Sequence, residues 1–208
     1  MKIAVFGGTF DPVHNGHLTI AREAIEQMAF NRVLFVPAGL PYKKERKITS
    51  IAYRLAMLRI ALGNDKKFVI DLTNANEGKP SYTFELIEAL KKKYPRGTEF
   101  HLLIGTDNLL QFPEWLCPEQ VLKMCRLAVF PRQVGETVNM DELEKKVKGI
   151  TFATSFLNYP PAEISSTMVR NRVVRGEDIS TLVPHDVREY IKYRKLYGGE
   201  GTHVSLFM

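Results

Sequence analysis

The feature that most constrains this chain is a short segment near its beginning, where an apolar run is followed at once by glycines and two histidines. The run Ile3–Phe6 is typical of a buried strand, and the segment after it contains His14 and His17. A helix is predicted next, because apolar residues recur at helical spacing at Leu18, Ala21, Ile25 and Met28. A helix that starts beyond a strand presents free backbone N–H groups and the positive end of its dipole, which favour phosphate.

The glycines of this segment indicate a turn that a ligand can approach closely. Gly7 and Gly8 allow a sharp bend without a side chain in the way, and Asn15 is the predicted N-cap of the helix. His14 and His17 are three residues apart, so they share one face at the start of the helix. The segment has neither the Gly-x-Gly-x-x-Gly dinucleotide fingerprint nor the Gly-Lys-Ser/Thr ending of a P-loop.

The pattern His14-x-Gly16-His17 at the start of the first helix resembles the signature of the nucleotidyltransferase superfamily, which class I aminoacyl-tRNA synthetases share. The resemblance implies that both imidazoles contact the triphosphate of a nucleotide where charge develops during transfer. Two histidines at this spacing are more often ordinary surface or core residues. The surrounding Gly-Gly-Thr-Phe-Asp-Pro segment, directly after the first strand, favours the functional interpretation.

Strands and helices are predicted to alternate along the whole chain, which favours an α/β fold with a doubly wound, mostly parallel sheet flanked by helices, Rossmann-like in type. The predicted strands are 2–6, 32–36, 68–72, 100–104, 127–130 and 150–153. The predicted helices are 16–29, 50–62, 82–93, 118–123, 140–147, 166–174 and 186–195. The apolar stripe of the second helix is predicted at Ile51, Leu55, Leu58 and Leu62. We expect one domain over residues 1–197 and a tail over residues 198–208.

Composition narrows the functional classes further. The 208 residues carry a net charge of +6, which suits an anionic ligand without selecting nucleic acid over a nucleotide. There is no apolar run long enough for a membrane span, and the chain enters a predicted strand at once, so we expect no signal peptide and a cytoplasmic location. Cys117 and Cys125 have no Cys-x-x-Cys spacing, so neither a zinc site nor a disulfide framework is predicted.

Ligands of parallel sheets bind beyond the carboxyl ends of the strands, so the loops there are candidates for the site. The loop 37–47 is rich in Lys and Arg near its end, which indicates either a solvated charge run or an arm that binds phosphate. In the segment 78–86, Ser81 is a predicted helix cap with Glu85 near the capping-box position, and the same N–H groups could hold a ligand carboxylate.

The loops after the fourth and fifth strands and the start of a later helix complete this set. Asp107 follows Gly105 and could accept from a ribose hydroxyl, while Trp115 is equally well explained as core or as a stacking surface. Ser165 or Ser166 is a predicted cap of the helix that carries Arg170, which would make a second phosphate-binding site.

Together these stretches resemble the bacterial nicotinate-nucleotide adenylyltransferase family over roughly residues 1–197. The matching motifs are Gly8-Thr9-Phe10-Asp11-Pro12-x-His14-x-Gly16-His17, Lys44, Ser81-Tyr82-Thr83, Gly105-x-Asp107, Trp115 and Ile164-Ser165-Ser166-Thr167-x-x-Arg170. The family's usual Pro-Pro-His-Lys is Pro41-Tyr42-Lys43-Lys44 here, so the contact of that histidine is not carried over. Its Ser-Tyr-Thr-x-Asp-Thr continues here as Phe84-Glu85-Leu86, so the last two side-chain roles are not carried over either.

The resemblance implies transfer of an adenylyl group from ATP to nicotinate mononucleotide, with Mg²⁺ accompanying ATP and no metal-ligating residue in the protein. The implied catalytic residues are His14, His17, Lys44 and Arg170. The implied ATP-binding residues are Gly7, Gly8, Thr9, Phe10, Gly105, Asp107, Arg132, Ile164, Ser165 and Ser166. The residues implied to bind the mononucleotide are Ser81, Tyr82, Thr83 and Trp115.

Several alternatives stay open at this point. A sister enzyme could use another phosphomonoester such as phosphopantetheine, although Ser81-Tyr82-Thr83 with Trp115 speaks against it. Preference for the amide mononucleotide is harder to exclude, because amide and carboxylate differ by one atom. A class I synthetase is disfavoured, since the Lys-Met-Ser-Lys-Ser loop is missing. A catalytically silent nucleotide-binding regulator is disfavoured by the intact His14, His17 and Arg170. Neither nucleic acid nor a membrane is an expected partner, and a homo-oligomer is left open.

Overall fold

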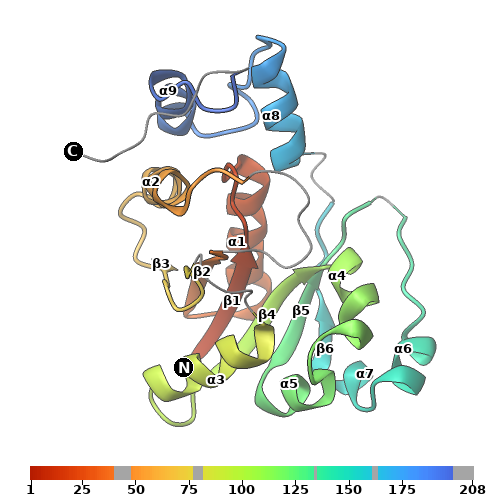
Figure 1. The fold of residues 1–208 in the computed structure, drawn as a ribbon. Coiled ribbons are helices and arrows are strands. Elements are labelled where there is room, and N and C mark those ends of the chain that lie inside the picture. Colours follow the sequence, from red (N-terminus) through yellow and green to blue (C-terminus); the bar gives the residue numbers. More distant parts are fainter. Residues whose placement is uncertain (40–47, 77–81, 134, 161–163, 199–208) are drawn as a thin grey trace.

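A six-stranded parallel sheet forms the centre of the protein (Figure 1). The structure is a computed structural model that describes residues 1–39, 48–76, 82–133, 135–160 and 164–198. The strand order is β3-β2-β1-β4-β5-β6. The strands are β1 (Lys2–Gly8), β2 (Arg32–Pro37), β3 (Phe68–Ile70), β4 (Glu99–Gly105), β5 (Arg126–Phe130) and β6 (Thr154–Phe156). The predicted doubly wound α/β fold is therefore confirmed.

Helices cover both faces of the sheet, because alternate residues of each buried strand point to opposite sides. Ala4 and Phe6 face one core, while Ile3 and Val5 face the other. The first core is covered by α1 (Asn15–Met28), α2 (Ile51–Leu62), α8 (Ser166–Val174) and α9 (His185–Tyr193). The second is covered by α3 (Thr83–Lys93), α4 (Thr106–Gln111), the 3-10 helix η1 (Phe112–Glu114), α5 (Pro118–Met124), α6 (Met140–Lys146) and α7 (Ile150–Ala153).

One predicted strand is wrong. Residues Ile150–Ala153 form the short helix α7, and the sixth strand follows it at Thr154–Phe156. Residues 150–153 are apolar except for Thr151, and four residues are too few for a periodicity that separates a strand from a helical turn. Glu144 decides for the helix, because its carboxylate accepts from the N–H groups of Gly149 and Thr151, at 2.7 and 3.0 Å. The helix α4 was not predicted.

The second helix also differs from its predicted apolar stripe. Leu58 and Leu62 are buried as expected, but Ile51 and Leu55 are half-buried. Arg54, which no apolar pattern would place inside, is fully buried.

The strand order places a topological switch point between β1 and β4, because the chain moves to β2 on one side of β1 and to β4 on the other. Loops leaving the carboxyl ends of these two strands diverge there, and a crevice is expected. The register pairs Gly8 of β1 with Pro37 of β2, so both strands end at the same level. The site described below lies at this position.

His101 is a buried histidine on β4, far from the carboxyl end of that strand. Its side chain lies edge-on to Phe30 at 5.0 Å, and neither ring nitrogen has a hydrogen-bond partner among the described residues. Burial, together with the charges of Lys2 and Arg126, lowers the pKa of His101 to about 4.

We therefore expect the protein to lose stability as the pH falls from 7 towards 4. In the unfolded chain His101 takes up a proton near its ordinary pKa of 6.5, whereas the folded protein does so only near 4. The stabilising difference is thus present above 6.5 and is lost in acid. Between pH 7 and 5 the unfolding free energy of wild type should fall about 1–2 kcal/mol more than that of His101→Leu. Urea titrations at both pH values measure this, and equal losses would contradict it.

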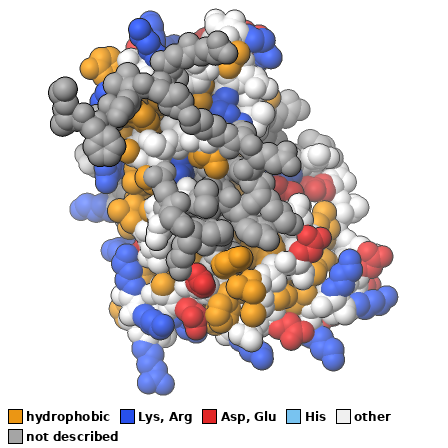
Figure 2. Space-filling view, in the orientation of Figure 1, with side chains coloured by type: hydrophobic (Ala, Val, Ile, Leu, Met, Phe, Trp, Pro, Cys, Tyr) orange, Lys and Arg blue, Asp and Glu red, His pale blue; other side chains and the backbone are white. Residues whose placement is uncertain are grey.

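The surface carries its basic charge in a dispersed way on the face drawn in Figure 2. Lys and Arg side chains are spread around the outline of the described part of this face, with acidic side chains between them. Among the helices of the described segments, none has the length and apolar character needed to cross a bilayer. Cys117 and Cys125 are both free, and burial raises the pKa of Cys125 to about 12. The predicted tail falls almost entirely within residues 199–208, which lie outside the described residues, so the division at residue 197 stays a prediction.

Candidate active site

The loop between β1 and α1 places the two histidines against each other at the start of the helix. The N-cap is His14, so the predicted cap Asn15 is wrong and is instead the first helical residue. The backbone N–H of His14 donates to Nδ1 of His17 at 3.2 Å, and the two rings stack with centroids 3.6 Å apart. Asn15 has a different task, because its side chain donates to the carbonyl of Thr181 at 3.0 Å.

Both imidazoles are neutral in the free protein. Burial, followed by the nearby charge of Arg132, lowers the pKa of His14 to about 3. The pKa of His17 is lowered well below its ordinary value by burial, by His14 and by Arg132. Because Nδ1 of His17 accepts a hydrogen bond, the proton of this neutral ring is on Nε2, which can donate to a ligand. His14 Nδ1 is buried without a partner among the described residues, so a ligand could satisfy it.

Two aromatic side chains pack against the ring of His17. The ring of Phe10 lies 5.0 Å from that of His17, and the ring of Phe6 lies 5.8 Å from it. A Cβ at Gly8 would lie 3.0 Å from Cζ of Phe10, so glycine at this position lets the aromatic ring pack beneath the loop.

The N-terminus of α8 faces the same loop. Ser165 is its N-cap, with Oγ accepting from the N–H of Met168 at 3.1 Å, as predicted for one of the two serines. Ser166 Oγ donates to the carbonyl of Pro12 at 2.8 Å, and Arg170 Nη1 donates to the carbonyl of Asp11 at 2.7 Å. The arginine is thus held at the loop that carries the histidines.

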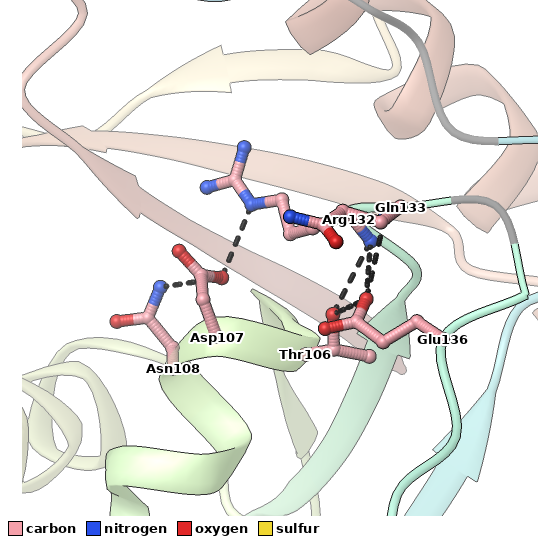
Figure 3. Close-up of polar contacts among 6 residues, drawn as sticks. All are labelled: Thr106, Asp107, Asn108, Arg132, Gln133 and Glu136. Carbon is pink, nitrogen blue, oxygen red and sulfur yellow. Dashed lines mark hydrogen bonds and ion pairs between the residues drawn. The ribbon is translucent and has the colours of Figure 1, made fainter.

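Figure 3 shows how α4 and the loop after β5 meet on the other side of the site. Asp107 Oδ1 accepts from Arg132 Nε at 3.1 Å, across the end of β4. Glu136 accepts from the backbone N–H groups of Arg132 and Gln133, at 3.0 and 3.3 Å, and from the hydroxyl of Thr106. The Thr106 hydroxyl, with these N–H groups, holds the pKa of Glu136 below its usual range. No pattern in the sequence pointed to Glu136, whose hydrogen bonds hold the loop that carries Arg132.

A cavity of about 810 Å³ joins these parts at the carboxyl ends of the strands, within the size range of small-molecule sites. It brings together most of the residues predicted from the sequence to bind a nucleotide: Gly7, Gly8, Thr9, Phe10, His14, His17, Asp107, Arg132, Ile164, Ser165, Ser166 and Arg170. Gly105 does not line it.

A second cavity of about 260 Å³ adjoins the first, since Gly7, Gly8, Thr9 and Arg132 line both. Thr83, Gly105 and Trp115 line the second cavity. Trp115 is half-buried, with its ring 5.1 Å from that of Phe112, so it is both packed on one side and available to the cavity. Tyr82 is the N-cap of α3, one residue after the predicted cap, and does not line the cavity. Lys43, Lys44 and Ser81 lie outside the described residues.

Arg54 of α2 lies beneath both loops and was not predicted as a site residue. Its guanidinium donates to the carbonyls of Thr9, Ala38 and Gly39, at 2.7, 2.8 and 3.1 Å, and to that of Thr49 at 2.8 Å. The loop after β1 and the loop after β2 are therefore held by one buried cation. An arginine in an amphipathic helix normally predicts a solvent-facing position, so no pattern in the sequence could have found this role.

Comparison with protein families decides the membership of the chain. The cytidylyltransferase-like family matches residues 5–172, which include the histidine motif and Arg170. The chain belongs to this family. Its curated relatives include a protein of Dehalococcoides mccartyi named probable nicotinate-nucleotide adenylyltransferase, 37% identical over 199 residues that cover 95% of this chain and 97% of the relative. A protein of Clostridium kluyveri with the same name is 33% identical, over 95% of this chain and 99% of the relative.

Solved structures of the same type share the fold of this cytidylyltransferase-like chain. A Plasmodium falciparum nicotinic acid mononucleotide adenylyltransferase complexed with NaAD superposes with a TM-score of 0.75 at 19% identity, covering 94% of this chain and 97% of the other. A putative nicotinate-nucleotide adenylyltransferase from Vibrio parahaemolyticus gives a TM-score of 0.67 at 19% identity, covering 94% of each chain. The chain is a nucleotidyltransferase with a Rossmann-like fold.

Proposed function

We propose that this nucleotidyltransferase joins ATP and nicotinate mononucleotide to give nicotinate adenine dinucleotide and pyrophosphate, a step of NAD biosynthesis. The names of full-length relatives support the activity. The observation that carries the proposal for the site is the pair of adjoining cavities at the switch point, because two nucleotides must lie end to end for the transfer.

ATP would occupy the larger cavity, with its triphosphate between the histidines and the N-terminus of α8. Two neutral imidazoles donate N–H groups there without repelling each other, which two imidazolium rings stacked at 3.6 Å would do. Arg170 and the region of Ser166 would hold the leaving pyrophosphate, and Lys44 would bridge phosphates from the loop after β2. Asp107 would hold a ribose.

Nicotinate mononucleotide would occupy the smaller cavity. Its pyridine ring would stack on Trp115, and the backbone N–H groups of Tyr82 and Thr83, with Ser81, would meet the carboxylate at the start of α3. Because the cavities share Gly7 to Thr9, the phosphate of the mononucleotide would lie near the α-phosphate of ATP.

The chemistry needs neither a base nor a covalent enzyme intermediate. The attacking group is a phosphate monoester, which is mostly dianionic at pH 7 since its second pKa is about 6. One P–O bond forms at the α-phosphorus of ATP and the bond to pyrophosphate breaks. The protein aligns two anions and neutralises charge through imidazole N–H groups, Arg170 and backbone N–H groups.

Mg²⁺ would arrive with ATP, since magnesium is usually bound through substrate phosphates and water. In the described part of the chain, no group of three or more His, Cys, Asp or Glu side chains is placed to hold a metal. When bound, the ion would neutralise phosphate charge.

A cytoplasmic location also belongs to this proposal.

The proposal is tested by pyrophosphate release from ATP with three acceptors at equal concentration: nicotinate mononucleotide, nicotinamide mononucleotide and phosphopantetheine. We expect release with the nicotinate compound to exceed that with the others. A preference for the amide would make this an amide-specific enzyme of the same class, and a preference for phosphopantetheine would contradict the acceptor. No release with any acceptor would favour a nucleotide-binding regulator.

Gly105 provides a prediction for the ATP side of the site. A Cβ there would lie 2.5 Å from Arg132 Nε and closer still to Asp107 Oδ1, so Gly105→Ala should push this pair apart without unfolding the chain. Loss of one charge-assisted contact to ATP should raise its KM about tenfold. Steady-state kinetics with varied ATP measure this. Gly198→Ala is the control, because a Cβ there meets only an ordinary contact at 3.8 Å. An unchanged KM in Gly105→Ala would show that the pair does not contribute to ATP binding.

A further inference from the structure

The C-terminal helices α8 and α9 are joined to the loop between β1 and α1 by contacts between residues far apart in the sequence. In Figure 1 these helices lie beside α1 and α2, away from the helices on the opposite face. Arg170 and Ser166 of α8 donate to carbonyls of the loop, as described above. At the start of α1, the N–H of Asn15 donates to the carbonyl of Leu182 at 2.9 Å. We call these contacts between the loop and the C-terminal helices the joint. The histidines lie on one side of the proposed triphosphate site and Arg170 on the other, so their relative position depends on the joint.

Asp11 is the buried centre of the joint, with only 1% of its surface exposed. Its Oδ1 accepts from the hydroxyl of Tyr197 at 2.8 Å, and its Oδ2 accepts from the N–H of Thr49, before α2, at 3.4 Å. Its own carbonyl accepts from Arg170. One residue thus contacts the segment before α2, helix α8 and the segment after α9. A buried carboxylate needs such donors, since an unpaired one is costly.

Tyr197 reaches Asp11 from the segment that follows α9. Burial and the adjacent Asp11 charge raise the pKa of Tyr197, so its hydroxyl stays protonated and donates. The residue before it, Leu196, is buried in the same core as Val187 and Ile191 of α9. The backbone of Tyr197 has φ of +62°, an uncommon conformation for a residue other than glycine that persists where surrounding contacts fix it.

We propose that Tyr197 is a positioning residue. Its hydrogen bond to Asp11 holds helix α8 against the loop between β1 and α1, so that Arg170 and His17 face the same phosphates. The proposal rests on the proposed function for its reaction but not for its geometry. Neither Tyr197 nor Asp11 needs to contact a substrate for this effect. Tyr197 acts through Asp11, because the loop residue that accepts its hydroxyl also accepts from Arg170. Misplacement of a catalytic group by a fraction of an ångström lowers turnover more than it lowers binding of a distant substrate.

The test compares Tyr197→Phe, which removes only the hydroxyl, with Tyr193→Phe on α9, whose side chain is 77% exposed. We expect Tyr197→Phe to lower kcat about tenfold, while the KM for nicotinate mononucleotide stays within about twofold of wild type. Tyr193→Phe should leave both unchanged. Kinetics are measured well below the melting temperature of each variant, so that loss of folded protein does not enter kcat. A lowered melting temperature with unchanged kcat would overturn the proposal, because the hydroxyl would then be purely structural.

A double-mutant cycle separates positioning from a general loss of order. If Tyr197 acts through Arg170, Tyr197→Phe should lower kcat by less than about twofold in the Arg170→Ala background. An undiminished tenfold effect in that background would overturn the proposal. Should Tyr197→Phe fail to fold, Asp11→Ala is measured in the same way. It removes the carboxylate that accepts from Tyr197 but keeps the backbone carbonyl that accepts from Arg170, so an unchanged kcat would overturn the proposal.

Failure of the proposed reaction is distinguishable from failure of this inference. Amide hydrogen exchange of α8 needs no substrate, and we expect faster exchange over residues 166–174 in Tyr197→Phe than in wild type or Tyr193→Phe. If wild type turns over no acceptor but this difference is present, the function is wrong and the joint stands. If wild type is active and exchange is the same in all three proteins, the joint is wrong.

Discussion

Replacing His17 by alanine should lower kcat about 10²–10³-fold while leaving the protein folded, because one preorganised donor to developing charge is lost. His17 lines the larger cavity, and its Nε2–H is available since Nδ1 accepts from His14. The ring also contacts Phe6 and Phe10, so its removal leaves a small space above these aromatics. Some stability is lost as well, but the donor is the larger effect on turnover.

The measurement is kcat for pyrophosphate release at saturating ATP and acceptor, with circular dichroism to check folding. His185→Ala is the matched control, because His185 begins α9 with its side chain 73% exposed and lines neither cavity. His17→Gln should recover part of the loss, since its amide can donate. A folded His17→Ala protein with near wild-type kcat would remove the imidazole pair from the mechanism.

The first five strands were predictable because each contains a short apolar run. Four of them, β1, β2, β4 and β5, lie between two neighbouring strands and are largely buried, and β3, at one edge, is still partly buried. The sixth was not, since Thr154–Phe156 lies at the edge and is largely exposed, while the apolar run before it folds as α7. An apolar run reports burial, so it identifies strands that are at least partly buried and misplaces the exposed strand β6.

The features of the site also fall into those that could be predicted from the sequence and those that could not. The turn at Gly7 and Gly8, the histidine pair and the cap at Ser165 are local features, so their spacing in sequence predicts their position. Asp11, Arg54 and Glu136 each have partners that are distant in sequence: Tyr197 for Asp11, Thr9 and Ala38 for Arg54, and Thr106 for Glu136. Only the fold brings such partners together, and polar residues at these positions look like ordinary surface residues.

Arg54→Met should cost about 3–5 kcal/mol of unfolding free energy, because buried carbonyls lose their donor. Methionine keeps the length and apolar stem of arginine, so the helix itself is preserved. Thr9, Ala38 and Gly39 would each lose a hydrogen bond from the guanidinium, at a position that is fully buried in the wild-type protein. The loops after β1 and β2 would then separate, and both cavities would lose their shared wall.

Thermal unfolding measures the effect, and a loss of this size should lower the melting temperature by roughly 10 °C for a chain of this length. Arg59→Met is the control on the same helix, since Arg59 is exposed and its substitution should change little. Arg54→Lys separates charge from geometry. A lysine keeps the cation but cannot donate to carbonyls on both loops in the planar arrangement of guanidinium, so most of the loss should remain. If Arg54→Lys matched wild type in both melting temperature and kcat, burial of a positive charge, and not the bridging of two loops, would be the role of this residue.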